Sequence, residues 1–489
     1  MQNKGKKYTG IFVGLGVFVA MLLLPSPEGL SDAAWKVAAV TSLMGIWWIT
    51  EAISIPATAL LPIVLFPILG VTSISDATTP YANPLIFLFM GGFVIALAME
   101  KWNLHRRIAI RIVHAVGVNP SSIIIGFILA SAFLSMWVSN TATAVMMLPI
   151  AVSILELVSK ERSPDSGKHN FEVVLVLSIA YACNIGGMGT IIGTPPNALL
   201  AGFMLENYGI EISFLDWMLI GLPIILVTLP LMYWLLAKVI YPIRLKELPG
   251  GKAFIQQELN RLGTISKQEQ RVAYVFVGAA VLWMFRPLLG DILPGLSDAG
   301  IAILASVLLF MIPASHSKHT FILNWTDTKS LPWGVLILFG GGLSMASAIK
   351  TTGLAAWIGS GIATLGSWPV WVFVFLVVAL MIFLTEMTSN TASTATFLPI
   401  LASVALGLGE NPLLLAIPTV LAASCAFMLP VATPPNAIVY GSGRVSIPEM
   451  SKAGLWLNTL FILLLSIAAL TLIKWVFEIE LGVIPTWAQ

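Results

Sequence analysis

The chain has 489 residues, of which 58% are hydrophobic and 10% are charged, and its mean hydropathy is +0.93. Soluble domains carry about 25% charged residues, so this composition excludes a soluble globular protein and indicates an integral membrane protein. The net charge of +2 is too small to favour a nucleic-acid partner. Cys183 and Cys425 lie in apolar runs, and we expect buried, small apolar side chains there rather than a disulfide or a metal pair.

Apolar segments recur along the whole chain, and a helix needs about 20 residues to cross a bilayer. We therefore predict an all-α membrane protein with about eleven transmembrane helices and two further, interrupted segments. The uninterrupted segments lie near 10–24, 35–50, 54–70, 83–100, 172–187, 217–240, 271–289, 297–313, 333–349, 412–430 and 454–477. Lysines precede the first segment but no cleavage site follows it, so we interpret it as an uncleaved span rather than a signal peptide.

The first interrupted segment covers 121–157 and contains Ser139-Asn140-Thr141, which we call the first tip. Ser, Asn and Thr favour turns and helix caps, so the tip divides the segment into half-helices near 121–138 and 142–157. Each half is short for a full span, which favours a re-entrant hairpin with its polar tip near mid-membrane. One kinked spanning helix is the alternative.

The second interrupted segment, 369–405, repeats the first at a shift of 250 positions, with Ser389-Asn390-Thr391 as the second tip. Downstream, Thr194-Pro195-Pro196-Asn197 reappears as Thr433-Pro434-Pro435-Asn436 at a shift of 239. We call these the first and second Pro-Pro breaks. One Pro-Pro pair is commonly only a kink, but both interruptions recur in register, which indicates an internal duplication.

The distribution of basic residues predicts the orientation. With the N-terminus cytoplasmic and the C-terminus outside, all but Lys36, Arg286, Lys350 and Lys474 of the 25 Lys and Arg residues fall on inward connections. An odd number of spans separates the two hairpins, so they enter from opposite faces. Inverted repeats with interrupted helices are typical of a secondary transporter with its site near the midplane.

The duplication divides the chain into parts. Residues 1–34 form a cytoplasmic segment and the first helix, 35–240 the first inverted repeat with a broken helix around 190–197, 241–270 a cytoplasmic connector, and 271–489 the second inverted repeat with a broken helix around 430–437. In the connector, Ser266 and Glu269 have the spacing of a capping box. We expect a basic arm with Lys101, Arg106, Arg107 and Arg111 to be solvated or to lie at lipid head groups.

The tips have the chemistry of an ion site. The half-helix after each tip points free N–H groups and the positive end of its dipole inward, which suits an anion. Asn and Thr oxygens suit a hard cation. Consecutive prolines end the helix, which frees carbonyl groups that can bind another cation. The duplication therefore predicts two cation pockets beside one anion pocket.

Neither hairpin and neither Pro-Pro break contains Lys or Arg. Burying a dianion without compensation is costly, so co-bound cations are expected to neutralise it. Importing a dianion against an inside-negative potential costs about 4.6 kcal/mol per 100 mV. Importing two Na⁺ with it would cancel this cost. Glu51 and Glu386 lie at membrane depth, where ionisable groups are functional candidates. For Glu386 we consider tuning of cation binding or proton carriage, and for Glu51 hydrogen bonding at a helix end.

These residues resemble the divalent anion:sodium symporter family, which includes di- and tricarboxylate and sulfate transporters. The resemblance covers nearly the whole chain, and the segment 423–439 looks like the family signature throughout. It implies a homodimer that works by an elevator-type movement, with Na⁺ as the co-transported ion. It implies substrate contacts from Ser139, Asn140, Thr141, Ser389, Asn390, Thr391, Thr194 and Pro434. It implies one Na⁺ site at Ser135, Ser139, Asn140 and Gly193 and another at Thr385, Thr388, Asn390 and Ala432.

Two intact tips resemble those of the carboxylate-transporting members of the family. The resemblance therefore implies uptake of the C4-dicarboxylates succinate, malate and fumarate with Na⁺ across the cell (inner) membrane. Na⁺-independent dicarboxylate exchange and symport of sulfate or tricarboxylates are the alternatives. An anion channel is a further class, distinguishable by large unitary currents without counterflow. A membrane enzyme is disfavoured because the sequence contains no His-Glu-x-x-His and its histidines fall in loops or near span ends.

Overall fold

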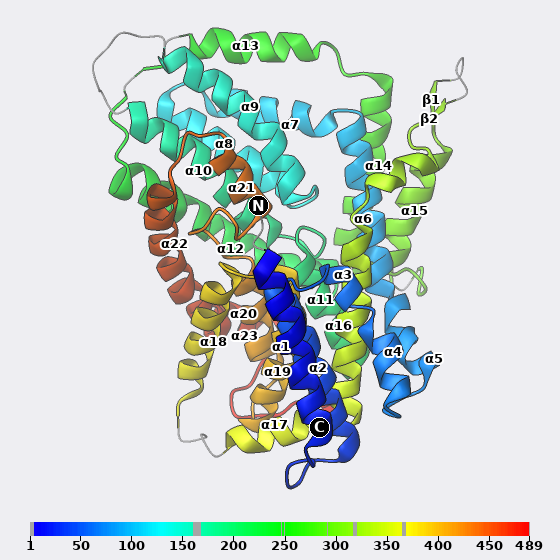
Figure 1. Cartoon of the computed structure of the whole chain (residues 1–489). Coiled ribbons are helices and arrows are strands. Elements are labelled where there is room, and N and C mark those ends of the chain that lie inside the picture. Colours follow the sequence, from blue (N-terminus) through cyan, green and yellow to red (C-terminus); the bar gives the residue numbers. More distant parts are fainter. Residues whose placement is uncertain are drawn as a thin grey trace.

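The computed structural model describes residues 4–159, 168–245, 247–248, 250–290, 292–315, 320–363 and 368–488 (Figure 1). Most of these residues are helical. The helices up to the connector are α1 Lys4–Leu23, α2 Asp32–Thr50, α3 Ile55–Thr58, α4 Leu61–Ile68, α5 Ile74–Thr78, η1 Thr79–Ala82, α6 Pro84–Lys101, α7 Leu104–Val116, α8 Pro120–Ser135, α9 Asn140–Ser159, α10 Lys168–Gly187, α11 Pro195–Tyr208, α12 Phe214–Trp234 and the π-helical turn η2 Leu235–Ile240.

The remaining elements include one small antiparallel pair of strands. They are α13 Gly251–Leu262, α14 Lys267–Leu289, α15 Asp298–Met311, β1 Pro313–Ser315, β2 Thr320–Phe321, η3 Trp325–Ser330, α16 Trp333–Thr351, α17 Leu354–Ala363, α18 Val370–Thr385, α19 Asn390–Gly407, α20 Leu413–Ala423, α21 Pro434–Gly441, α22 Ile447–Ala468, the π-helical turn η4 Ala469–Ile473, α23 Lys474–Val476 and η5 Thr486–Ala488.

Six helical segments among the described residues are long and apolar enough to cross a membrane. They are Ile74–Lys101, His169–Gly187, Phe214–Ile240, Lys267–Leu289, Trp333–Thr351 and Ile447–Val476. Several runs that were predicted as whole spans are shorter. The run 54–70 is divided into α3 and α4, each with proline in its first turn, where the missing N–H of proline would have had no partner within the helix. The run 412–430 stops being helical at Ala423.

Both tips break their helices as predicted. The first hairpin consists of α8 and α9 with the turn 136–139, and the second consists of α18 and α19 with the turn 386–389. Figure 1 shows the first hairpin with α7 and α13 in one half of the molecule and the second with α17 in the other. The predicted broken helices are also present, as α10 with α11 and as α20 with α21.

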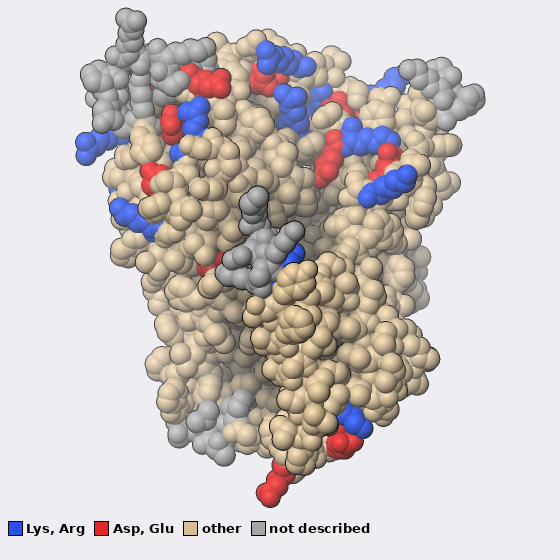
Figure 2. Space-filling model, viewed as in Figure 1, with Lys and Arg blue, Asp and Glu red and all other residues tan. Residues whose placement is uncertain are grey.

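Charge is concentrated at one end of the molecule. Figure 2 shows most Lys, Arg, Asp and Glu atoms at the end that carries α13, and few at the opposite end, where Figure 1 places the C-terminus. The first described residues of α1 lie at mid-height in Figure 1. Between these ends the visible surface is largely uncharged, as expected for a lipid-facing belt.

Three local features were predicted from the sequence. The capping box is confirmed, because Glu269 N–H donates to Ser266 Oγ at 3.1 Å and Ser266 N–H donates to Glu269 Oε2 at 2.7 Å. Cys183 and Cys425 are free and buried, as predicted. The prediction of a solvated arm is wrong for Arg107. Its side chain is 5% exposed and pairs with Glu269 at 2.9 Å, because the connector folds back over the arm and supplies carboxylate and carbonyl acceptors.

Candidate functional site

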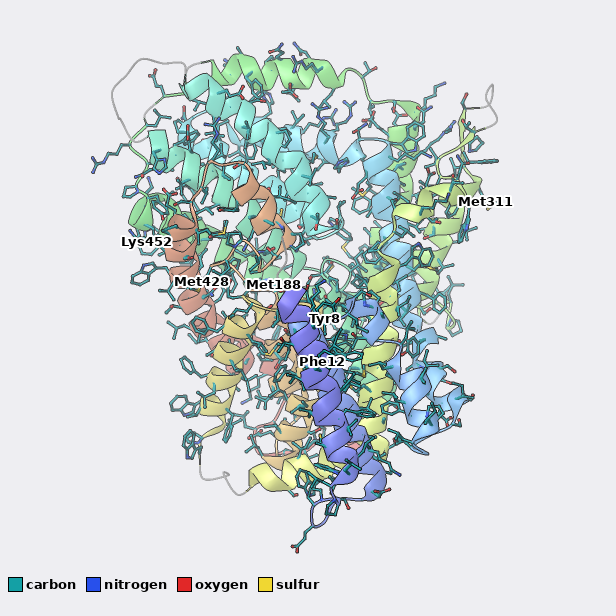
Figure 3. All side chains as sticks on the ribbon, in the orientation of Figure 1. Tyr8, Phe12, Met188, Met311, Met428 and Lys452 are labelled. Atoms are coloured by element: carbon teal, nitrogen blue, oxygen red, sulfur yellow. The ribbon has the colours of Figure 1, made fainter. Side chains whose placement is uncertain are left out.

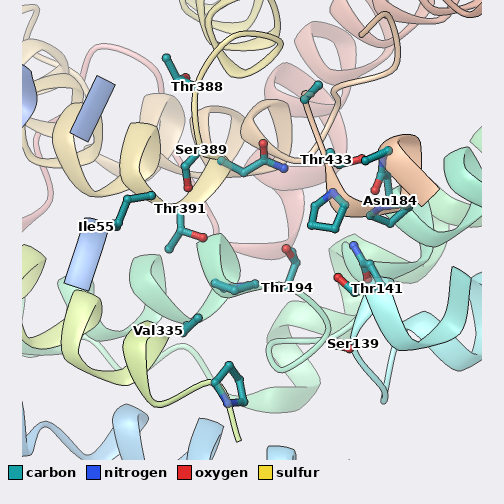
Figure 4. A pocket seen from close by; sticks show the side chains of 18 of the residues that line it. Ile55, Ser139, Thr141, Asn184, Thr194, Val335, Thr388, Ser389, Thr391 and Thr433 are labelled. Atoms are coloured by element: carbon teal, nitrogen blue, oxygen red, sulfur yellow. The ribbon is translucent and has the colours of Figure 1, made fainter. Parts of the chain in front are cut away.

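Both tips and both Pro-Pro breaks border one cavity of about 1810 Å³ (Figure 4). Eleven of the residues predicted to bind substrate or cation line it: Ser139, Asn140, Thr141, Gly193, Thr194, Thr388, Ser389, Asn390, Thr391, Ala432 and Pro434. In Figure 4, Ser139 and Thr141 lie on one side of this space and Ser389 and Thr391 on the other, with Thr194 between them. Residues that lie far apart in the sequence therefore share one solvent-accessible site.

The first tip turns its oxygen atoms inward. Ser135, the last residue of α8, is fully buried, does not line the cavity and donates a hydrogen bond to Asn140 Oδ1 at 2.5 Å. Ser139 Oγ accepts from Ala142 N–H at 3.2 Å and so caps α9. A Cβ on Gly187 would lie 3.0 Å from Asn140 Oδ1 and 3.2 Å from Gly193 O. Hydroxyl, amide and carbonyl oxygens thus come together here, as a hard cation requires.

The second tip has the same geometry with different side chains. Thr385 Oγ1 donates to Asn390 Oδ1 at 2.6 Å and also lies 2.9 Å from Ala423 O. Thr385 is fully buried and, like Ser135, supports the tip from behind the cavity wall. Thr388 Oγ1 shares a hydrogen bond with Ser393 Oγ at 2.6 Å. The predicted ligand sets at the two tips therefore have matching hydroxyl–amide pairs.

Helix starts surround the cavity. Helices α9 and α19 begin at Asn140 and Asn390, and α11 and α21 begin at Pro195 and Pro434. Unpaired N–H groups and the positive dipole ends at such starts favour a negatively charged ligand. Proline fits at the first turn because its missing N–H would have had no partner within the helix.

Two asparagines fix the Pro-Pro breaks in the same way. Asn197 Nδ2 donates to Gly187 O at 3.0 Å and to Thr190 O at 2.8 Å. Asn436 Nδ2 donates to Ala426 O at 3.0 Å and to Leu429 O at 3.1 Å. All of these partners are related by the shift of 239 positions that relates the two breaks. The asparagine of each break thus holds the non-helical loop before it.

Asn184 was not predicted, although it lines the cavity. Its Nδ2 lies 3.2 Å from Ala426 O, 3.2 Å from Thr433 Oγ1 and 3.4 Å from Asn436 Oδ1. It therefore connects the broken helix of the first half to that of the second. The one signal in the sequence was a single amide inside the apolar run 172–187.

The charges around the cavity have one sign. Among the lining residues that the structure describes there is no Lys or Arg, while Glu51 and Glu100 are present. Glu51 ends α2 in the left-handed conformation at φ 48°, and its backbone N–H bonds to Trp47 O. Hydrogen bonding at a helix end was expected for Glu51, but this contact is made by its backbone N–H and does not test a role for its carboxylate. Its side chain is exposed and belongs to the cavity wall.

Glu386 is 3% exposed and is not part of the cavity wall. Its carboxylate accepts hydrogen bonds from the backbone N–H groups of Phe427, Met428 and Leu429, in the loop before the second Pro-Pro break, and from Asn458 of α22. The group is therefore held between the second tip, this loop and α22.

The cavity has a second wall of different composition. Thr9 and Gly10 of α1, Ile55 of α3, Gly92 of α6 and Val335 of α16 line it without belonging to either hairpin or broken helix. Figure 4 shows Ile55 and Val335 facing the space in front of the tips. The hairpins and broken helices thus form the wall that carries the tips. The other helices form a wall that is largely apolar but also carries Glu51 and Glu100.

Two solved structures are similar to this one in fold. The Alcanivorax borkumensis YdaH transporter aligns with a TM-score of 0.59 at 15% identity, over 90% of this chain and 98% of that chain. The Neisseria gonorrhoeae protein MtrF, described as an antimetabolite efflux pump, aligns with a TM-score of 0.57 at 13% identity, over 97% and 96% of the two chains. These similarities concern the fold.

Sequence comparison is more specific. The sodium-dependent dicarboxylate transporter SdcS of Staphylococcus saprophyticus is 43% identical over 478 residues, which cover 96% of this chain and 92% of that protein. SdcS of Staphylococcus aureus is 43% identical over 484 residues, with coverages of 97% and 92%. The family model described as the sodium:sulfate symporter transmembrane region matches residues 5–479. The chain therefore belongs to this family of divalent anion:sodium symporters.

Proposed function

We propose that the protein takes up C4-dicarboxylates together with Na⁺, with succinate, malate and fumarate as substrates. The 43% identical relatives are sodium-dependent dicarboxylate transporters, and the family consists of transporters, so an enzymatic function is set aside. The observation that carries the proposal is the cavity: two uncharged polar tips and four helix starts face a space that no described Lys or Arg lines.

A dianion in this cavity needs compensating charge, since burying an isolated charge is costly. In the proposed mechanism two Na⁺ provide it. One Na⁺ binds at Ser135, Ser139, Asn140 and Gly193, and the other binds at Thr385, Thr388, Asn390 and Ala432. The Ser135–Asn140 and Thr385–Asn390 contacts of 2.5 and 2.6 Å support these sites, because each brings two oxygens together behind a tip. Each hydroxyl would release its amide oxygen and turn a lone pair to the ion.

The substrate contacts follow from the same wall. Thr141 and Thr391 offer hydroxyl groups, and Thr194 and Pro434 stand at the starts of α11 and α21. One carboxylate would bind at each tip, with N–H and hydroxyl donors on one side and a Na⁺ on the other. The tips lie on opposite sides of the space in Figure 4, which suits a ligand with two separated carboxylates better than a compact anion such as sulfate.

An elevator movement is supported by the two walls. Helices α8 to α11 and α18 to α21 would form the moving unit, as two inverted repeats with re-entrant hairpins. Helices such as α2, α6 and α16 would belong to a fixed scaffold. The cavity extends to Glu100 and Ser330, beside the ion pair of Lys101 with Asp327. If the charged end of the molecule that carries α13 is cytoplasmic and the C-terminus is outside, the structure is an inward-open state.

The other parts of the proposal are a homodimer in the cell (inner) membrane and a cytoplasmic N-terminus. The largely uncharged belt in Figure 2 and the charged end near α13 support a membrane position with that end inside. The scaffold helices would form the dimer contact, because the moving unit must stay free to slide.

Uptake by purified protein in proteoliposomes tests the function. Labelled succinate should accumulate under an inward Na⁺ gradient, and replacing Na⁺ by choline should abolish uptake. Unlabelled malate and fumarate should compete, while sulfate and citrate should compete poorly. Counterflow from succinate-loaded vesicles at full rate without Na⁺ would replace symport by exchange. Competition by sulfate stronger than that by malate would replace the dicarboxylate by sulfate as substrate.

A further inference from the structure

Glu386 combines deep burial with an unusual set of partners. Its Oε1 atom accepts from Phe427 N–H at 2.7 Å, Met428 N–H at 2.9 Å and Asn458 Nδ2 at 2.8 Å, and its Oε2 atom accepts from Leu429 N–H at 3.0 Å. All four donors are neutral. The ion pairs among the described residues do not include Glu386. Four donors directed at two oxygens stabilise the ionised carboxylate without cancelling its charge.

The first repeat has no such charge. Met136 occupies the corresponding position, at the shift of 250. There, Thr190 Oγ1 donates to Met136 O at 2.6 Å and Trp217 Nε1 donates to Met188 O at 2.9 Å. Neutral hydrogen bonds therefore fix the first loop against its tip, while a carboxylate fixes the second. Figure 3 shows Met188 and Met428, one from each loop, at mid-height of the molecule.

The carboxylate lies between both segments that carry the second proposed Na⁺ site. On one side it follows Thr385 directly in the chain, and Thr385 donates to Asn390 Oδ1. On the other side it holds Leu429 N–H, and the loop continues through Pro430 and Val431 to Ala432, all of which line the cavity. A unit charge in a buried site acts strongly on a nearby cation, since water screens it little.

We propose that Glu386 is a positioning residue that supplies a fixed negative charge to the second Na⁺ site, so that this site binds Na⁺ more tightly than the first and fills before it. This inference rests on the proposed function. The first Na⁺ site, beside Met136, binds its ion by neutral oxygens alone.

The variant E386Q tests this, because it keeps the size of the side chain and removes its charge. Na⁺ binding is measured by thermal shift without substrate, and Na⁺ activation by succinate uptake. We expect the half-maximal Na⁺ concentration to rise at least about tenfold in both, since one neighbouring charge commonly shifts an ionic equilibrium by about one to three decades. The half-maximal succinate concentration at saturating Na⁺ should change less.

Two variants separate charge from packing. N458L removes one donor to Glu386 and keeps the charge, so its half-maximal Na⁺ concentration should stay within about threefold of the wild type. E410Q is the matched control, since Glu410 is also buried and accepts one backbone N–H, from Gly482 at 2.9 Å, but does not line the cavity. It should leave Na⁺ binding unchanged.

Unchanged Na⁺ binding in E386Q, or an equal loss in N458L, would overturn the inference. If E386Q does not fold, E386D decides instead: it keeps the charge and should retain Na⁺ activation within about threefold, and a full loss there would mean that geometry rather than charge matters. Failure of the proposed function is distinguishable, because then the wild type itself would show no Na⁺-dependent uptake.

Discussion

The two tips perform matching tasks with different side chains. Behind the first tip, Ser135 contacts Asn140, and behind the second, Thr385 contacts Asn390. The residue that follows is Met136 in one repeat and Glu386 in the other. The asparagines that donate into the loops, Asn197 and Asn436, are the same in both. The comparison shows that the oxygen pairs and loop geometry are kept, while the charge beside them differs.

The arms after the paired helices α6 and α16 differ as well. In the first repeat Arg107 is buried against Glu269 and donates to Leu262 O and Gly263 O of the connector. The corresponding residue of the second repeat is Trp357, whose Nε1 donates to Glu28 O at 3.2 Å. The connector occurs once in the chain and supports the arm of the first repeat with ionic contacts. The sequence has no second connector to support the arm of the second repeat in the same way.

If the tips share the substrate, removing either amide should abolish transport. N140A and N390A are each expected to lower succinate uptake at least about a hundredfold, because hydrogen bonds to charged groups contribute about 1.5–3 kcal/mol each and each amide serves both a Na⁺ and a carboxylate. Uptake into proteoliposomes measures this. The control N207A removes a buried asparagine whose amide donates to Phe203 O within its own helix at 3.1 Å, and it should transport. Near-normal uptake in either tip variant contradicts the site.

The arms should respond unequally. R107A leaves Glu269 without its buried partner and is expected to destabilise the protein by about 3–5 kcal/mol. W357F removes one hydrogen bond of a partly exposed side chain and should cost about 1 kcal/mol or less. Thermal or denaturant unfolding in detergent gives both values. Equal losses would mean that the connector does not favour the first arm.

Gly193 and Ala432 occupy the same position of the two repeats, and the structure predicts different tolerance. A Cβ on Gly193 would collide with Gly187 O, so G193A should destabilise by about 1–3 kcal/mol and weaken Na⁺ activation. A432G removes only a methyl group and should cost about 1 kcal/mol or less. Unfolding midpoints and Na⁺ titrations of both variants test the pair, and a harmless G193A would contradict the close loop packing.

The smallest expected effect concerns the ends of α6 and α16. Lys101 pairs with Asp327 at 2.7 Å, whereas the corresponding Thr351 bonds within its own helix. Partial burial raises the pKa of Asp327, but the Asn324 N–H and Lys101 outweigh it and hold that pKa below its ordinary value. A carboxyl group with a lowered pKa stabilises the fold at pH values above its unfolded-state pKa, which is near 3.8. This stabilisation is lost as the pH falls through the folded-state pKa.

D327N should therefore cost only about 0.2–1 kcal/mol at pH 7, as for other solvent-accessible pairs. Its unfolding free energy should also fall less than that of the wild type as the pH drops below about 4. T351V, its counterpart in the second repeat, should show the wild-type pH dependence. A loss in D327N of several kcal/mol would show that this ion pair is more than a surface contact.

Much of the site could be predicted because its features are local. Ser139-Asn140-Thr141 interrupts an apolar helix whatever surrounds it, and Pro195 and Pro434 start helices because they cannot continue one. Asn184, Asn197 and Glu386 could be seen as polar residues in apolar runs, but not their partners, which lie 7 to 252 positions away. Arg107 was misplaced because nothing in its own helix shows that the connector covers it.

The sequence by itself determined the helical class, the position of each polar interruption, the duplication and the absence of basic residues from the tips, because hydrophobicity, proline and short polar side chains act within a few residues of themselves. The tertiary structure decided which helices fall short of a span, that both tips and both breaks border one cavity, and that a lone buried carboxylate lies beside only one of them. Those properties depend on which distant backbone groups contact a given side chain, and these contacts are determined by the packing of the whole chain.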